Sequence, residues 1–408
     1  MPATITRNFT NNDKFVWLVT LVYYINMFLS FGRSNAALLI ICSILVLVTT
    51  NYKFEFKLYH LFVFQFCLFC YATAFWAMGY AYAIDKGNTI FFIFLSMSVF
   101  YSYYEDLPKC GVDILLHIML YGAYIIVLYS IFFIGVSKLA SMSEDAERVS
   151  AGTNANTMGL VAATAIVINT YYYLSGKHRK LMLMAIPCIY LIAGSQSRKA
   201  LFMMVAGVVL LYFLKNLRGK KDNLLPIMKF VFFMGVIIGI FIFLSQTDLF
   251  SGAVRRMEGF INSVTGEGEV DSSTSKREFM RKIGWIQFSR TPLLGIGMGC
   301  ARLLTQKAMD IDGYLHCNYA ELAADGGIVG LISYYSMYIY VLVKEIKYFK
   351  VDNLAILFLA LIILKFFTDW GMVSYYSKGV YFSFMVYFLH IQWCKRQYPH
   401  LNKKRRAT

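Results

Sequence analysis

Charged residues are scarce in this chain of 408 residues, because Asp, Glu, Lys and Arg together make up only 15% of it. Average soluble domains carry about 25% charged residues, so the composition excludes an ordinary soluble catalytic domain. A secretory cleavage site is also missing, since the first apolar stretch ends at GRSN rather than at an A-x-A-like motif. We therefore expect a retained first helix and not a cleaved signal peptide.

Two further absences narrow the function. The motif CLFC at residues 67–70 has no second Cys pair, which favours packing inside an apolar helix over a metal site. The net charge of +16 does not form a nucleic-acid surface, because its Lys and Arg lie in short loops between apolar runs and at the C-terminus. We expect no nucleic acid, no metal and no other cofactor.

The chain is instead rich in apolar residues, which make up 58% of it. Several runs reach roughly 16–25 residues, long enough to span a ~30 Å hydrocarbon core. The sequence predicts an all-α, polytopic integral membrane protein with about 12 transmembrane helices, forming a single membrane domain over residues 1–408. The expected spans are 15–31, 36–50, 58–79, 89–104, 112–135, 156–174, 181–195, 199–214, 230–246, 327–343, 354–369 and 378–394.

Basic clusters set the expected orientation of these spans. Cytoplasmic loops carry an excess of Lys and Arg, and the spans place all the main clusters and the N-terminus on that side. The one long connection, 247–326, then becomes an extracytoplasmic loop, and its pattern over 276–294 predicts that it is partly helical. A connection of this length is usually functional or disordered. The main basic clusters are 175–180, 215–229, 344–350 and 394–408.

Polar residues crowd the end of this loop, in GYLHCNYAELAADGG (313–327). His316 and Asn318 share a face if the backbone there is extended. Asp325-Gly326-Gly327 predicts an N-cap for the span that follows, and a helix N-terminus suits an anion. The alternative is that each of these is an ordinary interfacial polar residue.

Basic side chains gather at the same outer boundary. Arg198 and Lys199 precede one span, while Arg277 and Arg281 are spaced i, i+4 on one helix face. Because Arg binds phosphate through two parallel hydrogen bonds, this cluster could hold the diphosphate of a lipid carrier. Interfacial snorkelling is the alternative, and it is the better account of Lys199.

The order of these motifs resembles one family. Four motifs follow one another along the chain. The first is N-x-N-x-x-G, which contains Asn156, and the second is SRK, directly before a span. The third is a loop with R, W and PLLGIG, and the fourth is H-x-N-Y-x-E-L-x-x-x-G-x-x-G. This order is similar to that of the bacterial O-antigen ligase and repeat-unit polymerase (Wzy-type) family of surface-polysaccharide assembly. The motifs cover residues 150–345 and do not separate polymerase from ligase.

The resemblance implies a multi-spanning transferase of the inner membrane that uses an undecaprenyl-diphosphate-linked oligosaccharide at the outer face, without metal. Polymerases extend O-antigen, capsule or exopolysaccharide repeat units, and ligases pass the glycan to lipid A-core. By motif, Arg198, Arg277 and His316 match the family's functional residues, with Arg281 a rival to Arg277. A chain-length regulator is a further candidate partner besides the bilayer.

Elementary chemistry is compatible with these roles. Cleaving a glycosyl diphosphate needs donors that stabilise the leaving group, which Arg supplies, and a base near the acceptor hydroxyl. His316 is the candidate base, although it could equally bind the diphosphate as a cation, and Glu321 is a weaker candidate. We assign Arg281, Asn318, Asn156 and Glu321 to substrate binding.

We favour a repeat-unit polymerase. The alternatives are an O-antigen ligase and a lipid-linked sugar transporter. A transporter is less favoured, because it is expected to carry midplane charges, whereas here the ionisable residues cluster at the outer face.

Overall fold

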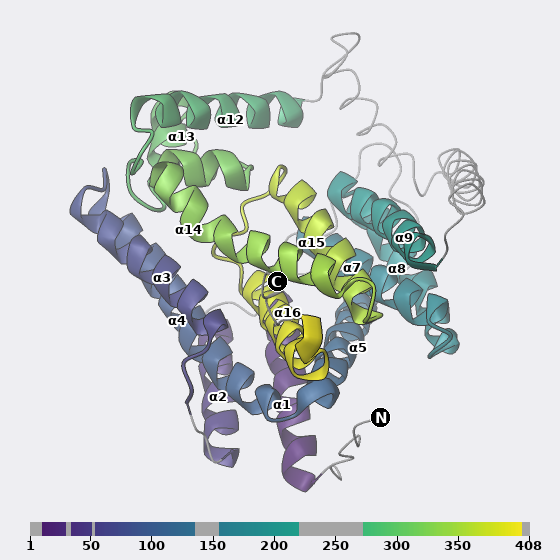
Figure 1. Cartoon of the computed structure of the whole chain (residues 1–408). Coiled ribbons are helices and arrows are strands. Elements are labelled where there is room, and N and C mark those ends of the chain that lie inside the picture. The colour runs from purple at the N-terminus through teal and green to yellow at the C-terminus, as the bar shows by residue number, and fades with distance from the viewer. Residues whose placement is uncertain (1–9, 30–33, 51–53, 135–154, 220–271, 402–408) are drawn as a thin grey trace, which may run out of the picture.

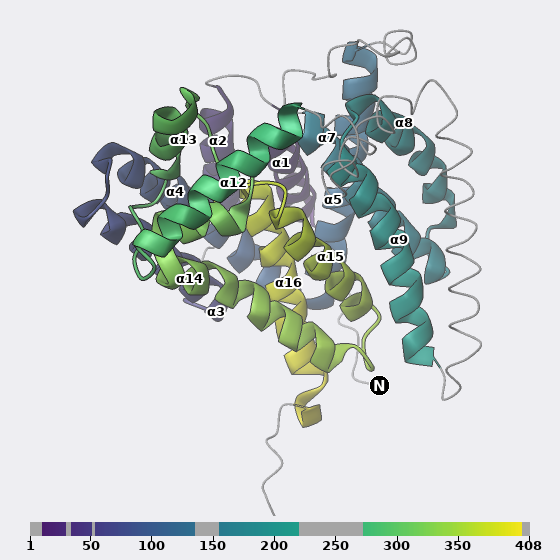
Figure 2. The same ribbon diagram turned by 90° about the horizontal axis from the view of Figure 1, so that it is seen from above.

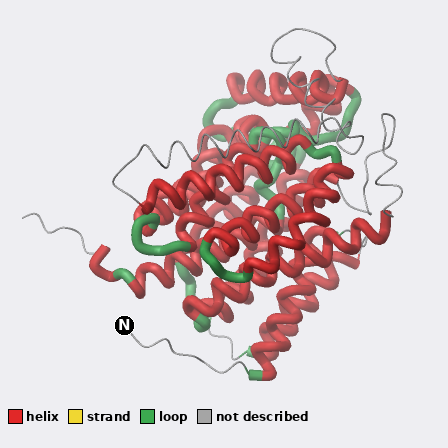
Figure 3. The backbone as a smooth tube through the Cα atoms, turned by 90° about the vertical axis from the view of Figure 1, so that its right-hand side faces the viewer, coloured by secondary structure: helices red, strands yellow, loops and turns green. Residues whose placement is uncertain are grey.

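The computed structural model describes residues 10–29, 34–50, 54–134, 155–219 and 272–401. Within these ranges the chain forms only helices, turns and loops, which confirms the predicted all-α class (Figure 3). Among the described residues, six helices are long and apolar enough to cross a membrane, so the chain is a membrane protein. The expected span 230–246 lies outside the described residues, as does the part of the long loop before residue 272.

Eleven of the twelve expected spans correspond to helices of the described chain. These are α1 (Asn11–Phe28), α2 (Ser34–Thr49), α3 (Leu58–Ala72), α4 (Tyr80–Glu105), α5 (Pro108–Ile134), α7 (Ala155–Leu174), α8 (Ala185–Ser195), α9 (Arg198–Gly219), α14 (Asn318–Tyr348), α15 (Leu354–Asp369) and α16 (Lys378–Gln397). Two more, α12 (Ser272–Arg290) and α13 (Ala301–Met309), lie within the expected loop. Short 3-10 turns are η1 (Thr73–Phe75), η2 (Arg179–Met184) and η3 (Pro399–Leu401).

The helices pack as a bundle around one apolar core (Figure 1). α7 lies against α5, α8 and α9, while α3 pairs with α4 and α1 with α2. Small residues permit the closest approaches: a Cβ on Gly207 of α9 would lie 2.4 Å from Val167 of α7. Such contacts suit a membrane bundle, in which close packing of backbones replaces the hydrophobic drive of water.

Loops gather at the two ends of this bundle. At one end, Lys86 near the start of α4 lies 4.0 Å from the ring centroid of Tyr376, just before α16. At the other, Glu105 at the end of α4 pairs with Lys57 and Arg396, each at 3.4 Å. We name these the His316 end and the His390 end after the clusters described below. The helix termini that share an end are those that the basic clusters predict to lie on the same side of the membrane. Which side each end faces stays a prediction.

α12 lies across the His316 end and packs on the first turns of α14 (Figures 1 and 2). A small separate core joins them, containing Met280, Leu315, Cys317 and Ala320. Gly284 makes the fit possible, because a Cβ there would lie 2.5 Å from Leu315 Cδ1 and 3.1 Å from the carbonyl oxygen of Ala320. The crossing carries the basic residues of α12 over the start of α14.

Candidate active site at the His316 end

The segment before α14 holds His316 in an unusual backbone conformation. Its φ is +57°, in the left-handed region that few non-Gly residues adopt, so the chain turns sharply here. The backbone N–H of Leu315 donates to Glu321 Oε2 at 2.7 Å, which ties the segment to the first turn of α14. The Tyr314 ring lies 4.3 Å from the imidazole, centroid to centroid. An extended backbone, the condition under which His316 and Asn318 would share a face, is therefore not met.

The surroundings of His316 disfavour its charged form. Burial, together with the positive charges of Arg277 and Lys199, lowers the pKa of His316 from its ordinary value of 6.5 to about 4. The imidazole is then neutral near pH 7, and the same surroundings make it a weaker base than a free histidine. The two cations come from α12 and α9, so charges from two segments distant in sequence act on this ring.

Lys199 acts electrostatically on the same imidazole as Arg277. It was interpreted as an interfacial side chain, yet its charge reaches His316 and its Cε lies 3.2 Å from where a Cβ would stand on Gly371. The one available signal was its place directly after Arg198 at the start of a span.

The other predicted arginines lie at the same end. Arg281, one turn after Arg277 on α12, has its guanidinium carbon 5.7 Å from the Trp370 ring centroid. Arg198 is the first residue of α9. The turn before it is fixed by Asn156, whose Oδ1 accepts a hydrogen bond from Ser197 Oγ at 2.9 Å. Asn156 thus supports the start of α9, and its predicted substrate-binding role stays a prediction.

Asn318 points into the protein, where it is fully buried. Its Oδ1 accepts hydrogen bonds from the backbone N–H groups of Ser374 and Tyr375, at 2.8 and 3.0 Å. Its Nδ2 donates to the Tyr335 hydroxyl at 2.8 Å. Every polar atom of the side chain is engaged within the protein, so the observed geometry gives Asn318 a positioning role, and contact with substrate stays a prediction.

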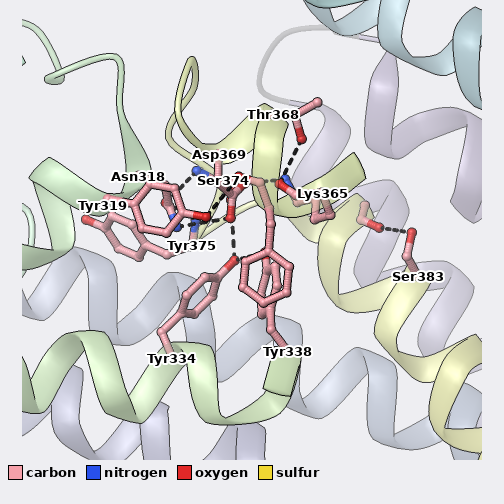
Figure 4. A network of polar contacts seen from close by, with 12 residues as sticks. Asn318, Tyr319, Tyr334, Tyr338, Lys365, Thr368, Asp369, Ser374, Tyr375 and Ser383 are labelled. Carbon is pink, nitrogen blue, oxygen red and sulfur yellow. Dashed lines mark hydrogen bonds and ion pairs between the residues drawn. The ribbon is translucent and has the colours of Figure 1, made fainter. Parts of the chain in front are cut away.

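Asp369 is the centre of the network to which Asn318 belongs (Figure 4). It is fully buried, and its Oδ1 accepts from Lys365 Nζ and Ser374 Oγ, both at 2.7 Å. The Tyr335 hydroxyl donates to Oδ2 at 3.2 Å. A buried carboxylate needs such partners, because an uncompensated charge is strongly destabilising. The network fixes the end of α15 against the start of α14.

The glycine-rich turn at 291–299 is held by Asp325 and by a kink in α14. Asp325 accepts from the backbone N–H groups of Gly299 and Ala301, at 2.8 and 2.6 Å. The kink lies at Gly327, whose φ is +60°, and a Cβ there would stand 2.4 Å from the carbonyl carbon of Leu293. Position 327 therefore needs glycine, and position 325 needs a carboxylate that accepts these two hydrogen bonds.

The expected start of a helix at residue 327 is a kink instead, since α14 begins at Asn318 and continues through it. The N–H groups after the kink do not face an anion: Ile328 donates to the carbonyl of Pro292 at 2.8 Å, and Val329 to that of Leu293 at 3.2 Å. The predicted anion site at this helix N-terminus is therefore wrong. Positive charge at this end comes from side chains.

Comparison with known proteins supports the motif pattern. Residues 183–335 match the family model described as O-antigen ligase. The matched segment contains Lys199, Arg277 and His316, and the predicted resemblance to the O-antigen ligase and repeat-unit polymerase family is confirmed for it. No curated protein sequence matches the chain.

Proposed function

We propose that this membrane protein, in which residues 183–335 carry the pattern of the O-antigen ligase family, polymerises lipid-linked glycan repeat units. The donor would be an oligosaccharide on undecaprenyl diphosphate, and the reaction would take place at the His316 end, on the outer face of the bacterial inner membrane. One observation carries the proposal: the charges of Arg277 and Lys199 act on the partly buried imidazole of His316, and all three residues lie in the matched segment.

The proposed step is a glycosyl transfer. The acceptor hydroxyl of the next repeat unit attacks the anomeric carbon of the donor, and its proton passes to the imidazole of His316. The bond from the anomeric carbon to the phosphate oxygen breaks, and its electron pair leaves with the diphosphate. Arg277, Lys199 and Arg198 stabilise that growing negative charge, because preorganised cations act most strongly where charge develops. Arg281 and Trp370 lie beside this path and offer a cationic and aromatic surface to the sugar.

An apolar cavity next to the network fits the lipid part of such a donor. Its volume is about 160 Å³, and it lies between α1, α7, α9, α15 and α16. Phe28, Met203 and Val380 line it, while Lys365 and Thr368 reach it from the buried network. A hydrocarbon chain gains roughly 0.8 kcal/mol for each CH₂ that it buries, so a few prenyl units would hold the donor near the cations.

The test compares matched variants in cells that carry no other copy of the gene. His316→Ala removes the proposed base, which typically costs about 10²–10⁴ in rate, so we expect glycans of single-repeat length. Arg277→Lys keeps the charge and loses the two-pronged guanidinium, and it should shorten the ladder as well. The controls are Arg290→Ala, at the exposed end of the same helix, and His178→Ala, an exposed histidine. A wild-type ladder from His316→Ala, at wild-type protein level, would overturn the assignment.

Ligase activity is the second candidate, because the matching family model is described as O-antigen ligase. Purified protein in liposomes separates the two. With lipid-linked repeat units as sole substrate, lengthening products support the polymerase. Products that form only when lipid A-core is added would support the ligase. Movement of the lipid-linked sugar between leaflets without any glycosyl transfer would contradict both the polymerase and the ligase. It would support a transporter instead.

A further inference from the structure

A second polar cluster lies at the His390 end, away from the proposed reaction. His390 of α16 is fully buried between two carboxylates. Its Nδ1 lies 3.0 Å from Glu345 Oε1, near the end of α14, and its Nε2 lies 3.0 Å from Asp352 Oδ1, in the turn before α15. Cys394 follows one helical turn after His390, and its Sγ lies 3.3 Å from the same Nε2.

This arrangement has the composition of a metal site. Nε2 of His390, Oδ1 of Asp352 and Sγ of Cys394 all lie within 4.8 Å of one another. Residues spaced i, i+4 share a helix face, so His390 and Cys394 present their ligand atoms together. Nitrogen, oxygen and sulfur ligands are those that Zn²⁺ accepts, at about 2.0–2.3 Å from the metal.

Glu345 is not one of the three ligands, but it contacts the other ring nitrogen of His390. Histidines that bind a metal usually donate their other ring N–H to a carboxylate, which fixes the tautomer and the ring orientation. Glu345 Oε1 stands at that position beside Nδ1. We propose that His390, Asp352 and Cys394 bind a divalent zinc-type cation, with Glu345 as the positioning residue for the imidazole.

A metal-free alternative is a doubly protonated His390 that bridges the two carboxylates. It accounts for Glu345 and Asp352 but leaves the cysteine unexplained. A single N–H at Nε2 donates well to one acceptor, whereas both the Asp352 oxygen and the Cys394 sulfur face this nitrogen. A cation placed among the three atoms satisfies them together. The charges of one carboxylate and one thiolate also cancel those of a divalent ion, which suits a buried position.

The site would have a structural role. Its residues join the end of α14, the turn before α15 and α16, three parts of the chain that would otherwise be held here by apolar contacts and hydrogen bonds. Asp352 lies in the turn between α14 and α15 and is the ligand nearest to the surface, with 7% of its surface exposed against 0% for His390 and Cys394. Cobalt can replace zinc in such sites, and its bond to a thiolate produces a charge-transfer absorption band.

The experiment uses the full chain purified in detergent. We expect one zinc per chain by elemental analysis, and a thiolate band when Co²⁺ is added after chelation. Cys394→Ser should abolish the band, and Glu345→Gln should weaken Co²⁺ binding by about 10–100-fold. The control is Cys188→Ser, because Cys188 is equally buried but lies in α8. A chelator should lower the melting temperature of the wild type and leave that of Cys394→Ser unchanged.

Wild-type protein with no zinc and no thiolate band would overturn the proposal and leave the doubly protonated histidine as the account of the cluster. A band that persists in Cys394→Ser would also overturn it, since the ligand would then lie elsewhere. The outcome is independent of the proposed glycosyl transfer, because the His316 variants are scored by glycan length and these variants by metal content.

Discussion

Replacing Asn318 by Ala is the sharpest test of how the candidate site is built. The substitution removes the only acceptor that the described contacts provide for the backbone N–H groups of Ser374 and Tyr375. It also removes the donor to Tyr335 and to Asp369. The side chain is fully buried, so water does not readily replace these bonds.

The size of the effect follows from those contacts. A buried donor left without a partner costs about 1–3 kcal/mol, so the two N–H groups together predict a loss of about 2–6 kcal/mol in the free energy of unfolding. Asn88→Ala is the matched control. Asn88 accepts a single exposed hydrogen bond, from the Tyr71 hydroxyl at 2.8 Å, and losing it should cost about 1 kcal/mol or less.

The assay is unfolding of the purified protein in mixed micelles, followed by tryptophan fluorescence against increasing denaturing detergent. Asn318→Ala should unfold well before Asn88→Ala. Equal stability of the two variants, with loss of glycan transfer in Asn318→Ala alone, would refute the positioning role. The predicted contact between Asn318 and substrate would then be the better account of this residue.

Three further predictions concern the same end of the molecule. The pKa of His316 falls from 6.5 to about 4 on folding, so the unfolded state binds the proton at a higher pH than the folded state does. The free energy of unfolding should therefore decrease as the pH drops from about 6.5 to about 4. His316→Gln should flatten this pH dependence in the same unfolding assay. Gly327→Ala should cost about 1–3 kcal/mol in backbone strain, because its φ of +60° with ψ of −158° is essentially limited to glycine, and about 1–3 kcal/mol in overpacking against Leu293. The loss is measured in the free energy of unfolding beside that of Gly313→Ala, whose Cβ would meet nothing closer than 3.4 Å. All eight cysteines lie in described residues, and only Cys110, at the His390 end, is exposed. With that end in the cytoplasm, a membrane-impermeant maleimide should label Cys110 only after permeabilisation, whereas Ser289→Cys on α12 should react in intact spheroplasts. The reverse labelling pattern would show that the orientation is inverted.

The positions of the helices could be predicted from the sequence because apolar runs of sufficient length have few alternatives to a buried helix. Their ends were harder to predict. α4 begins at Tyr80 rather than at residue 89, since Asp85, Lys86 and Asn88 are polar but compatible with a helix at the membrane boundary. At Gly327 the signals for a helix start and for a kink coincide, because glycine is common at N-caps and also adopts the positive φ of this kink readily.

The site was predictable in its residue types but not in its contacts. Motif order identified Arg277 and His316, because each lies in a short pattern that the family resemblance covers. The convergence of α9 and α12 on His316 is a property of the fold, and no spacing along the chain encodes it. For the same reason the sequence favoured an interfacial role for Lys199, and it gave no sign of the buried hydrogen bonds of Asn318. The cluster around His390 was also missed, since only the His-x-x-x-Cys spacing is local and its two carboxylates come from elsewhere.

The packing of α16 has a consequence for how the protein is made. This last helix lies against α1, α4, α5 and α14, and its backbone carbonyl at Tyr381 accepts a hydrogen bond from the hydroxyl of Tyr59, 322 residues earlier. Ribosomes deliver the helices to the membrane in chain order, so the surfaces of α1, α4, α5 and α14 that α16 covers are made before α16 itself. A nascent chain that stalls before residue 378 would leave these surfaces exposed to lipid.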